Sequence, residues 1–238
     1  MLRLNANSRS CVALLLLFHE VISPQIKNWT STEPETLPAT QSAILDAAAR
    51  MFTINGFTSA SIDLIANQIG VTKGSVYYYY RSKADLFFAV HKRAMLMNLR
   101  EITAIVADAK LEPEEKLHAM AYRHARLMMD HLYYQRVTVQ GVELHRSGST
   151  TPAERDALSE VVAMRDAYEA LFVDVLKTGV AKSVFNNIDC ALAARSILGS
   201  LNWITVWFRP RNTDTDAFKE KVALQMAHQA VRGVAYQA

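Results

Sequence analysis

Hydroxyl, ammonium and phenol groups follow one another from Thr72 to Tyr80, in the run Thr-Lys-Gly-Ser-Val-Tyr-Tyr-Tyr-Tyr. Such groups hydrogen-bond the phosphate oxygens of DNA and the edges of its bases in the major groove. Gly70 stands two residues before the run and can supply the left-handed backbone of a tight turn. The segment therefore indicates nucleic-acid recognition by a short helix that begins after this turn.

Two helices are predicted upstream, because apolar residues recur at helical spacing in 44–52 and again in 62–69. Ser61 and Thr72 precede the second and third helices, and both residue types are good N-caps. In a helix-turn-helix the second helix lies in the major groove while the first braces it. Residues 39–85 therefore predict a three-helix DNA-binding domain, although a purely structural unit with an aromatic surface would show the same pattern.

The composition is that of a globular protein. The chain has 238 residues, of which 50% are hydrophobic and 21% charged, and its net charge of +3 permits a nucleic-acid partner without demonstrating one. No alternating β-branched run is long enough to predict a sheet. Cys11 and Cys190 lie far apart, so we expect no disulfide and no metal site, and reduced thiols suit a cytoplasmic protein.

The N-terminal segment, residues 1–38, is ambiguous. Arg3 and Arg9 precede an apolar run at 11–18, which resembles the start of a signal peptide. The run is shorter than the ~20 residues that a membrane-spanning helix needs, and no clean cleavage site follows it. We expect a disordered or misannotated extension; a membrane-tethered or exported helical protein is the alternative.

The remainder of the chain, residues 86–238, predicts a ligand-binding and dimerisation domain built from helices. Ser82 can cap the first of them, and Pro113 and Pro152 stand where proline suits the first turn of a helix. The predicted helices cover 83–108, 113–130, 133–144, 153–182, 189–208 and 216–234. The fold class is therefore all-α, with a three-helix head and a six-helix body.

A dense string of residues between positions 44 and 86 resembles the TetR family of transcriptional regulators. The matching residues are Ile44, Leu45, Ala47, Ala48, Phe52, Gly56, Phe57, Ser61, Ile65, Ala66, Gly70, Val71, Thr72, Lys73, Gly74, Val76, Tyr77, Tyr78, Tyr79, Ser82, Lys83 and Leu86. Three positions depart from the family pattern, Ala60, Ile69 and Tyr80, and they leave the class intact but the base preference open. The resemblance implies a repressor that binds a palindromic operator as a homodimer until a small molecule releases it.

The resemblance also implies roles for residues of the head. Ser61 and the amide groups that follow it are expected to hold a phosphate. Tyr80 is expected to be buried. The other expected DNA-binding residues are Thr72, Ser75 and Tyr78 at base edges, Lys73, Tyr77, Tyr79 and Lys83 at phosphates, and Gly74 of the same motif.

For the body, the resemblance implies a dimer interface on the last two long helices. Two helices this apolar cannot both be covered within one small body, and a twofold partner is the simplest cover. Core helices of a monomer are the alternative. The expected interface residues are Leu192, Leu198, Leu201, Phe218, Val222 and Met226.

The apolar stretch that follows Asn202 is similar to a subgroup of the family that responds to acyl-CoA thioesters. The effector would then be an acyl-CoA or another apolar ligand, and a drug-responsive repressor of an efflux system is the alternative. Arg209 could meet an anionic group of the ligand or merely cap its own helix end. The expected pocket residues are Tyr122, Met128, Trp203, Trp207 and Arg209.

Other chemistry finds little support in the sequence. His124 and His131 share a helix face but His118 does not, and core or surface histidines are the simpler interpretation than metal ligands. Glu143 and His145 cannot both point the same way on one helix. With no glycine-rich phosphate loop and no nucleophile elbow, we expect no enzyme and no cofactor.

Overall fold

The computed structural model describes residues 24–32, 36–146, 151–211 and 215–235. It divides into two compact units, residues 1–35 and residues 36–238. In the first unit, residues 24–32 form a helix, so the expectation of a disordered extension is wrong for this stretch. The apolar run at 11–18 lies outside the described residues. Among the helices that are described, none is long and apolar enough to cross a membrane.

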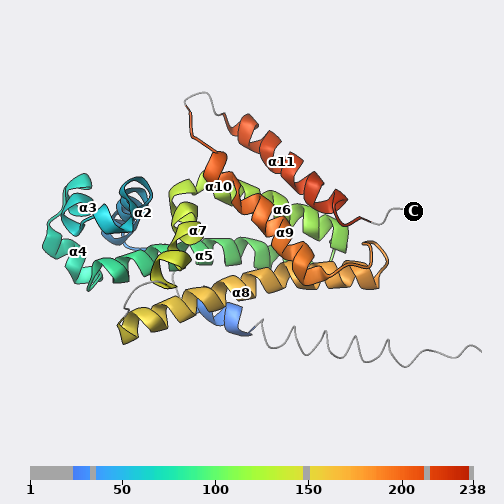
Figure 1. The fold of residues 1–238 in the computed structure, drawn as a ribbon, viewed down its shortest axis with the longest axis horizontal. Helices are drawn as coiled ribbons and strands as arrows, with labels where there is room; N and C mark the ends of the chain where they lie inside the picture. The colour runs from blue at the N-terminus through green and yellow to red at the C-terminus, as the bar shows by residue number, and fades with distance from the viewer. Residues whose placement is uncertain (1–23, 33–35, 147–150, 212–214, 236–238) are drawn as a thin grey trace, which may run out of the picture. The chain divides into compact units, whose positions relative to one another are not determined.

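The second unit begins with the three helices of the head, α2 (Ala39–Ser59), α3 (Ile62–Gln68) and α4 (Lys73–Tyr79) (Figure 1). Their starts follow from local chemistry. The hydroxyl of Ser61 accepts a hydrogen bond from the backbone N–H of Leu64, and that of Thr72 accepts from Ser75. Gly70 adopts a φ of 69°, which a residue with a side chain rarely tolerates. The predicted helix-turn-helix geometry is therefore present.

The last turn of α2 is bent. Gly56 has φ 75° and ψ 163°, a backbone conformation outside the helical region that interrupts α2 before its end at Ser59. Three phenylalanine rings pack together next to this bend. The centroid of the Phe57 ring lies 5.8 Å from that of Phe52, in a tilted arrangement, and 5.1 Å from that of Phe87, edge to face. The aromatic cluster fixes the path of the chain from α2 into α3.

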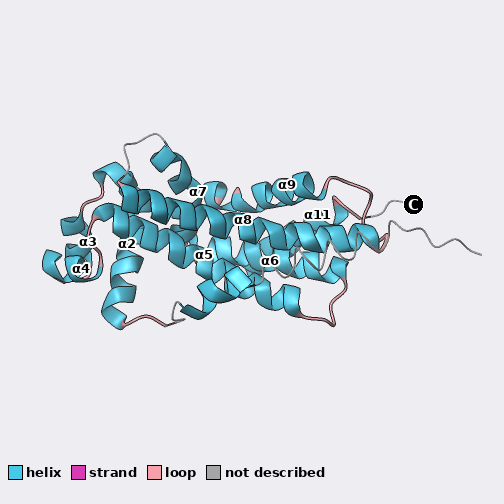
Figure 2. Cartoon of the chain, turned by 90° about the horizontal axis from the view of Figure 1, so that it is seen from below, coloured by secondary structure: helices cyan, strands magenta, loops and turns pink. Residues whose placement is uncertain are grey.

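The body contains two long helices, α5 (Lys83–Ala107) and α8 (Pro152–Ala181), that pack along each other (Figures 1 and 2). Two shorter helices, α6 (Pro113–Asp130) and α7 (Leu132–Arg146), pack against α5. The remaining helices are α9 (Cys190–Asn202), α10 (Ile204–Trp207) and α11 (Asp216–Arg232). The structure shows an all-α fold, as predicted.

The predicted helix over 189–208 is wrong in one respect, because it breaks at Trp203 into α9 and α10. The hydroxyl of Thr205 donates to the carbonyl oxygen of Asn202 at 2.7 Å. That carbonyl is the normal α-helical acceptor for Val206, whose N–H instead donates to Trp203 at 2.9 Å. The tightened turn redirects the chain before the loop at residues 208–211.

One buried core runs from the head into the body. It begins with Phe52 and Ile65 in the head, continues through Leu86 and Val90 of α5, and reaches Val137 of α7. Because α5 begins at Lys83, it crosses the predicted domain boundary between residues 85 and 86 without interruption. One core thus spans the predicted boundary, and the division into domains 39–85 and 86–238 stays a prediction.

Candidate functional site

The outer side of α4 is polar and aromatic, whereas its inner side is apolar. Val76 is buried and so is Tyr80, the latter as predicted, whereas Tyr78 is 83% exposed. Thr72 and Lys73 are also exposed. An exposed tyrosine next to exposed hydroxyl and ammonium groups presents a surface that can hydrogen-bond an incoming polar partner.

Two polar contacts hold this surface in place. The hydroxyls of Thr72 and Ser75 lie 2.9 Å apart, and the ammonium of Lys73 lies 2.7 Å from a carboxylate oxygen of Asp63. The hydrogen bond from Lys73 to Asp63 raises the pKa of the Lys73 ammonium. Both members of the pair are exposed, so the ion pair is weak and a phosphate can compete for the lysine.

Lys83 makes contacts within the head that the sequence did not predict. Its ammonium donates hydrogen bonds to the backbone carbonyls of Thr58 and Ala60, both at 3.0 Å. It also lies 4.7 Å from the centroid of the Phe57 ring. Lys83 therefore helps to close the end of α2, and its expected phosphate contact stays a prediction.

A half-open cavity of about 300 Å³ lies in the body between α5, α6, α7, α8 and α9. Its walls are mainly polar. The lining residues are Met95, Asn98, His124, Gln135, Thr138, Val139, Arg165, Asp166, Tyr168, Glu169, Arg195, Leu198, Gly199 and Asn202. A volume of this size lies at the lower end of the range for small-molecule sites.

His124 is at the inner end of this cavity and is 2% exposed. The amide oxygen of Asn202 lies 3.1 Å from Nε2 and can only accept, so Nε2 carries the proton and donates it. Nδ1 then accepts from the hydroxyl of Tyr168 at 2.7 Å. Burial lowers the pKa of His124 to about 4 and raises that of Tyr168 well above its usual range. Both groups are therefore uncharged at neutral pH.

A second polar group in the cavity wall is a reciprocal pair of amides. Asn98 of α5 donates to Gln135 of α7 at 3.1 Å, and Gln135 donates back at 2.8 Å. The two side chains are 4% and 0% exposed. A buried pair of this kind fixes the two helices relative to each other as long as both amides are satisfied.

α7 also contacts the head and the end of the body. Tyr134 donates to a carboxylate oxygen of Asp46 in α2 at 2.8 Å, and burial raises the pKa of Tyr134 far above its ordinary value. Arg136 donates to the backbone carbonyls of Thr205 and Phe208 at 2.8 and 2.9 Å. Gln135 stands between these two residues, so one helical turn connects the head, the cavity and α10.

An apolar surface remains uncovered on α9, α10 and α11. Leu192 is 62% exposed, Trp203 61% and Phe218 40%. A hollow of about 600 Å³ lies between α9 and the C-terminal part of α11, with Leu192 and Ala230 among its lining residues. Several large apolar side chains left exposed on α9, α10 and α11 are typical of an interaction surface.

Two family descriptions match the chain, and together they cover the head and the body. "Bacterial regulatory proteins, tetR family" matches residues 44–90. "Tetracyclin repressor-like, C-terminal domain" matches residues 110–234, which is more than half of the chain. The chain belongs to the TetR family. Members of the TetR family are DNA-binding regulators of transcription, which are not enzymes.

Among its relatives, the "Fatty acid metabolism regulator protein" of Bacillus subtilis strain 168 is 25% identical over 167 residues, 69% of this chain and 81% of that protein. Two solved TetR-family structures share the fold. The ketosteroid transcriptional regulator KstR2 of Mycobacterium tuberculosis superposes with a TM-score of 0.73 at 19% identity, over 85% of this chain and 98% of that chain. AibR in complex with isovaleryl coenzyme A and operator DNA superposes with a TM-score of 0.66 at 22% identity, over 80% of this chain and 97% of that chain.

None of the residues expected from the TetR resemblance to line the pocket lines the cavity. Tyr122 donates to Glu220 of α11, and Met128 is buried in the core. Trp203 and Trp207 are exposed by 61% and 42%. Arg209 donates to the backbone carbonyl of Val206 at 2.8 Å, so it caps its own helix end. The five expected residues therefore do not line this cavity, and their assignment to an effector site stays a prediction.

The expected dimer residues of this TetR body separate into two groups. Leu192 and Phe218 are exposed and Val222 and Met226 are half-buried, which leaves them available to a partner. Leu198 and Leu201 are buried within the chain, so their assignment to an interface is wrong. Val206 and Leu224 are also exposed, as are Trp203 and Trp207, which were expected in the pocket.

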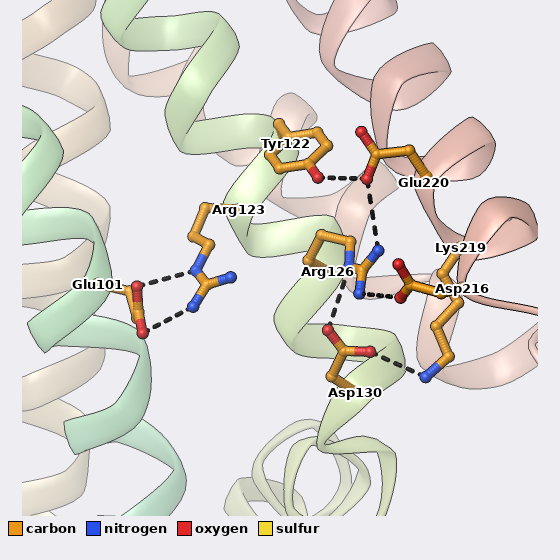
Figure 3. Close-up of polar contacts among 8 residues, drawn as sticks. All are labelled: Glu101, Tyr122, Arg123, Arg126, Asp130, Asp216, Lys219 and Glu220. Atoms are coloured by element: carbon orange, nitrogen blue, oxygen red, sulfur yellow. Dashed lines mark hydrogen bonds and ion pairs between the residues drawn. The ribbon is translucent and has the colours of Figure 1, made fainter.

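A cluster of charges joins α6 to α11 on the body (Figure 3). Arg126 contacts Asp130, Asp216 and Glu220 at 3.1, 2.6 and 3.4 Å. Lys219 of α11 lies 2.8 Å from the other oxygen of Asp130. These contacts hold α11 on α6 and so fix the surface that α11 presents.

Proposed function

We propose that the protein is a repressor that binds a palindromic operator as a homodimer through α4 and leaves it when a small effector enters the body cavity. The observation that carries this proposal is the two-sided α4, apolar and buried inside, polar and exposed outside. The buried core that continues from the head onto α5 and α7, two of the helices that line the cavity, supports the regulatory half of the proposal. A DNA partner places such a protein in the cytoplasm, and no membrane is involved.

In this proposal the side chains on the outer side of α4 have two roles in DNA recognition. Thr72, Ser75 and Tyr78 contact base edges, while Lys73, Tyr77 and Tyr79 hold phosphates and orient the helix. Ser61 and the first amides of α3 bind a further phosphate.

Gly74 also fits a surface that a large partner approaches closely. A Cβ at Gly74 would meet only the hydroxyl of Thr72, at an ordinary contact distance of 3.7 Å. Packing within the protein therefore does not require glycine at this position. We propose that the backbone of α4 comes close to DNA there.

The exposed apolar face of α9, α10 and α11 supports a twofold dimer. Leu192, Trp203 and Phe218 would be covered by the same face of a second copy. Such a dimer would set its two α4 helices about 34–36 Å apart, or a multiple of that spacing, to match successive turns of a palindrome.

For the effector we propose an acyl-CoA thioester. The similarity to a regulator of fatty acid metabolism and to AibR, solved with isovaleryl coenzyme A, supports this class. An effector that releases the operator must prefer the non-binding conformation by several kcal/mol, because only differential affinity shifts an equilibrium.

The test is to titrate the protein against a pool of random DNA duplexes and to sequence the bound fraction. The proposal expects enrichment of a palindrome whose affinity falls steeply with salt, since phosphate contacts release counterions. Analytical ultracentrifugation of the same sample should show a dimer. A folded, dimeric protein that enriches no sequence at any salt concentration would contradict the proposal.

A further inference from the structure

The helix α4 carries a single cation, and that cation is already neutralised within the head. Lys73 is the only lysine or arginine in the helix, whose sequence is Lys-Gly-Ser-Val-Tyr-Tyr-Tyr. Its ammonium lies 2.7 Å from a carboxylate oxygen of Asp63 in α3. As long as this ion pair is closed, α4 adds no net charge to the attraction between the protein and the phosphates of DNA.

Asp63 differs from the other two carboxylates of the head in what it contacts. Asp46 accepts a hydrogen bond from the hydroxyl of Tyr134 at 2.8 Å, and Asp85 accepts one from a backbone N–H at 2.8 Å. Within the described residues, the hydrogen bond and the ion pair recorded for the Asp63 carboxylate both go to Lys73. A carboxylate in the first turn of α3 also suits the helix dipole, but that role requires no lysine beside it.

The ion pair can open when DNA approaches. The side chains of Lys73 and Asp63 are 50% and 58% exposed, so water screens their attraction. DNA carries one phosphate charge per about 1.7 Å of its axis, a charge density that one carboxylate does not match. Lys73 releases a counterion when it moves to a phosphate, but the carboxylate that it leaves behind attracts a cation from solution. The pair therefore lowers both the affinity for DNA and the dependence of that affinity on salt.

We propose that Asp63 sets the affinity of the head for DNA, because it holds Lys73 in the free protein and so limits how tightly any duplex is bound. This inference rests on the proposed function, since it concerns the same DNA-binding surface. In this proposal Asp63 touches no DNA and acts through Lys73. A limited affinity suits a regulator, because an effector releases only an operator whose binding its own differential affinity can overcome.

The test compares the wild type with Asp63→Asn by fluorescence anisotropy, with a non-specific duplex and with a selected operator over a series of salt concentrations. Loss of the carboxylate should tighten binding to both duplexes about three- to tenfold at about 0.1 M salt, because one further net counterion is released. The slope of log affinity against log salt concentration should become steeper by about 0.9. Unchanged binding by a folded Asp63→Asn protein would overturn the proposal. Weaker binding would also overturn it, since Asp63 would then orient Lys73 towards a phosphate.

Variants of Lys73 test whether Asp63 acts through this residue. In a Lys73→Met background, Asp63→Asn should give about half or less of the gain in log affinity, because no ammonium is left to release. Asp63→Glu keeps the charge and can still reach Lys73, so it should bind DNA like the wild type. An equal gain in both backgrounds would show that Asp63 acts by its own charge alone, which contradicts the route through Lys73.

Glu114→Gln is the matched control. Like Asp63, Glu114 is an exposed carboxylate in the first turn of a helix, and its loss changes the net charge by the same amount. α6 begins beyond the far end of α5, whose 25 residues span about 37 Å at about 1.5 Å each. That length is several times the screening length of about 10 Å at 0.1 M salt. The control should therefore keep the affinity and the salt slope of the wild type, and a gain equal to that of Asp63→Asn would exclude a local effect.

The wild type tests the proposed function separately. If it selects an operator and Asp63→Asn shows no gain, the DNA-binding function stands and the inference about Asp63 fails. If the wild type binds no duplex at any salt concentration, the DNA-binding function itself is contradicted, and the inference about Asp63 fails with it.

Discussion

The head and the cavity of the body hold their polar side chains in opposite ways. In the head, Thr72 is held by Ser75 and Lys73 by Asp63, over sequence separations of three and ten residues, and all these groups reach solvent. In the cavity, the Asn98–Gln135 pair spans 37 residues, and His124 is tied to Tyr168 over 44 and to Asn202 over 78. The head surface is thus free to serve a partner, whereas the cavity groups also hold the body together.

Because of this difference, we expect substitutions in the head to change the affinity for a partner and substitutions in the cavity to change the stability of the fold. A substitution on the outer side of α4 removes contacts to a partner and little else. A substitution in the cavity removes contacts between helices of the body and changes the free energy of unfolding. The turn of α7 from Tyr133 to Arg136 is where the two regions meet, and four predictions test the comparison.

The largest expected effect is a pH dependence of the stability, which arises from His124 in the cavity wall. The folded-state pKa of His124 is about 4 against an ordinary 6.5, so the unfolded chain binds more protons between these values. Stability should therefore fall as the pH falls from 6.5 towards 4, by about 3 kcal/mol at about 1.4 kcal/mol per pH unit. Urea unfolding at a series of pH values should show this loss in the wild type and not in His124→Gln. Equal pH dependence in both proteins would contradict the assignment to His124.

On the head, Tyr78→Ala should weaken operator binding ten- to hundredfold, the loss of about 1–3 kcal/mol that one specific base contact typically contributes. Because Tyr78 is 83% exposed, the melting temperature should stay the same. Asn55→Ala, at an exposed position on α2, is the matched control and should bind like the wild type. A melting temperature that falls together with the affinity would show that Tyr78 acts through the fold instead.

Arg126→Met should destabilise the body by about 2 kcal/mol, between the values for exposed and for buried ion pairs. The Arg126 side chain is 13% exposed and its loss leaves three carboxylates close together. Arg123→Met is the control, since Arg123 and its partner Glu101 are about 40% exposed, and it should cost less than about 1 kcal/mol. Urea unfolding of both variants measures the difference, and equal losses would count against the role of Arg126.

The smallest effect is expected at the contact between body and head. Tyr134→Phe removes the hydrogen bond to Asp46 and should cost about 1 kcal/mol of stability. It should also reduce the factor by which an effector weakens operator binding. Tyr133→Phe keeps the ring that Arg50 covers and the backbone carbonyl that Thr53 contacts, so it should preserve both properties. Unchanged effector response in Tyr134→Phe would exclude this contact as a route between the regions.

The head could be predicted from the sequence because its determinants are local. Ser61, Gly70 and Thr72 act on neighbours within three residues, and their spacing is visible in the chain. The contacts of Lys83 within the head escaped prediction, since its acceptors at Thr58 and Ala60 depend on the bend at Gly56.

The cavity could not be predicted in the same way, because residues far apart in the sequence form its wall. The sequence of an apolar helix such as α9 does not reveal which of its sides the chain itself covers, so it does not separate the buried Leu198 from the exposed Trp203 that follows the helix. A usable signal was present in Asn98 and Gln135, polar residues on otherwise apolar helical faces. Such residues need a partner when they are buried.

The most direct test of the account compares a selected palindromic operator with a duplex that carries only one half-site. Fluorescence anisotropy at fixed salt gives both affinities. A dimer that places two α4 helices in successive major grooves should bind the full palindrome at least a hundredfold more tightly than the half-site. Equal affinities, in a protein shown to be dimeric, would contradict the claim that paired α4 helices read the operator.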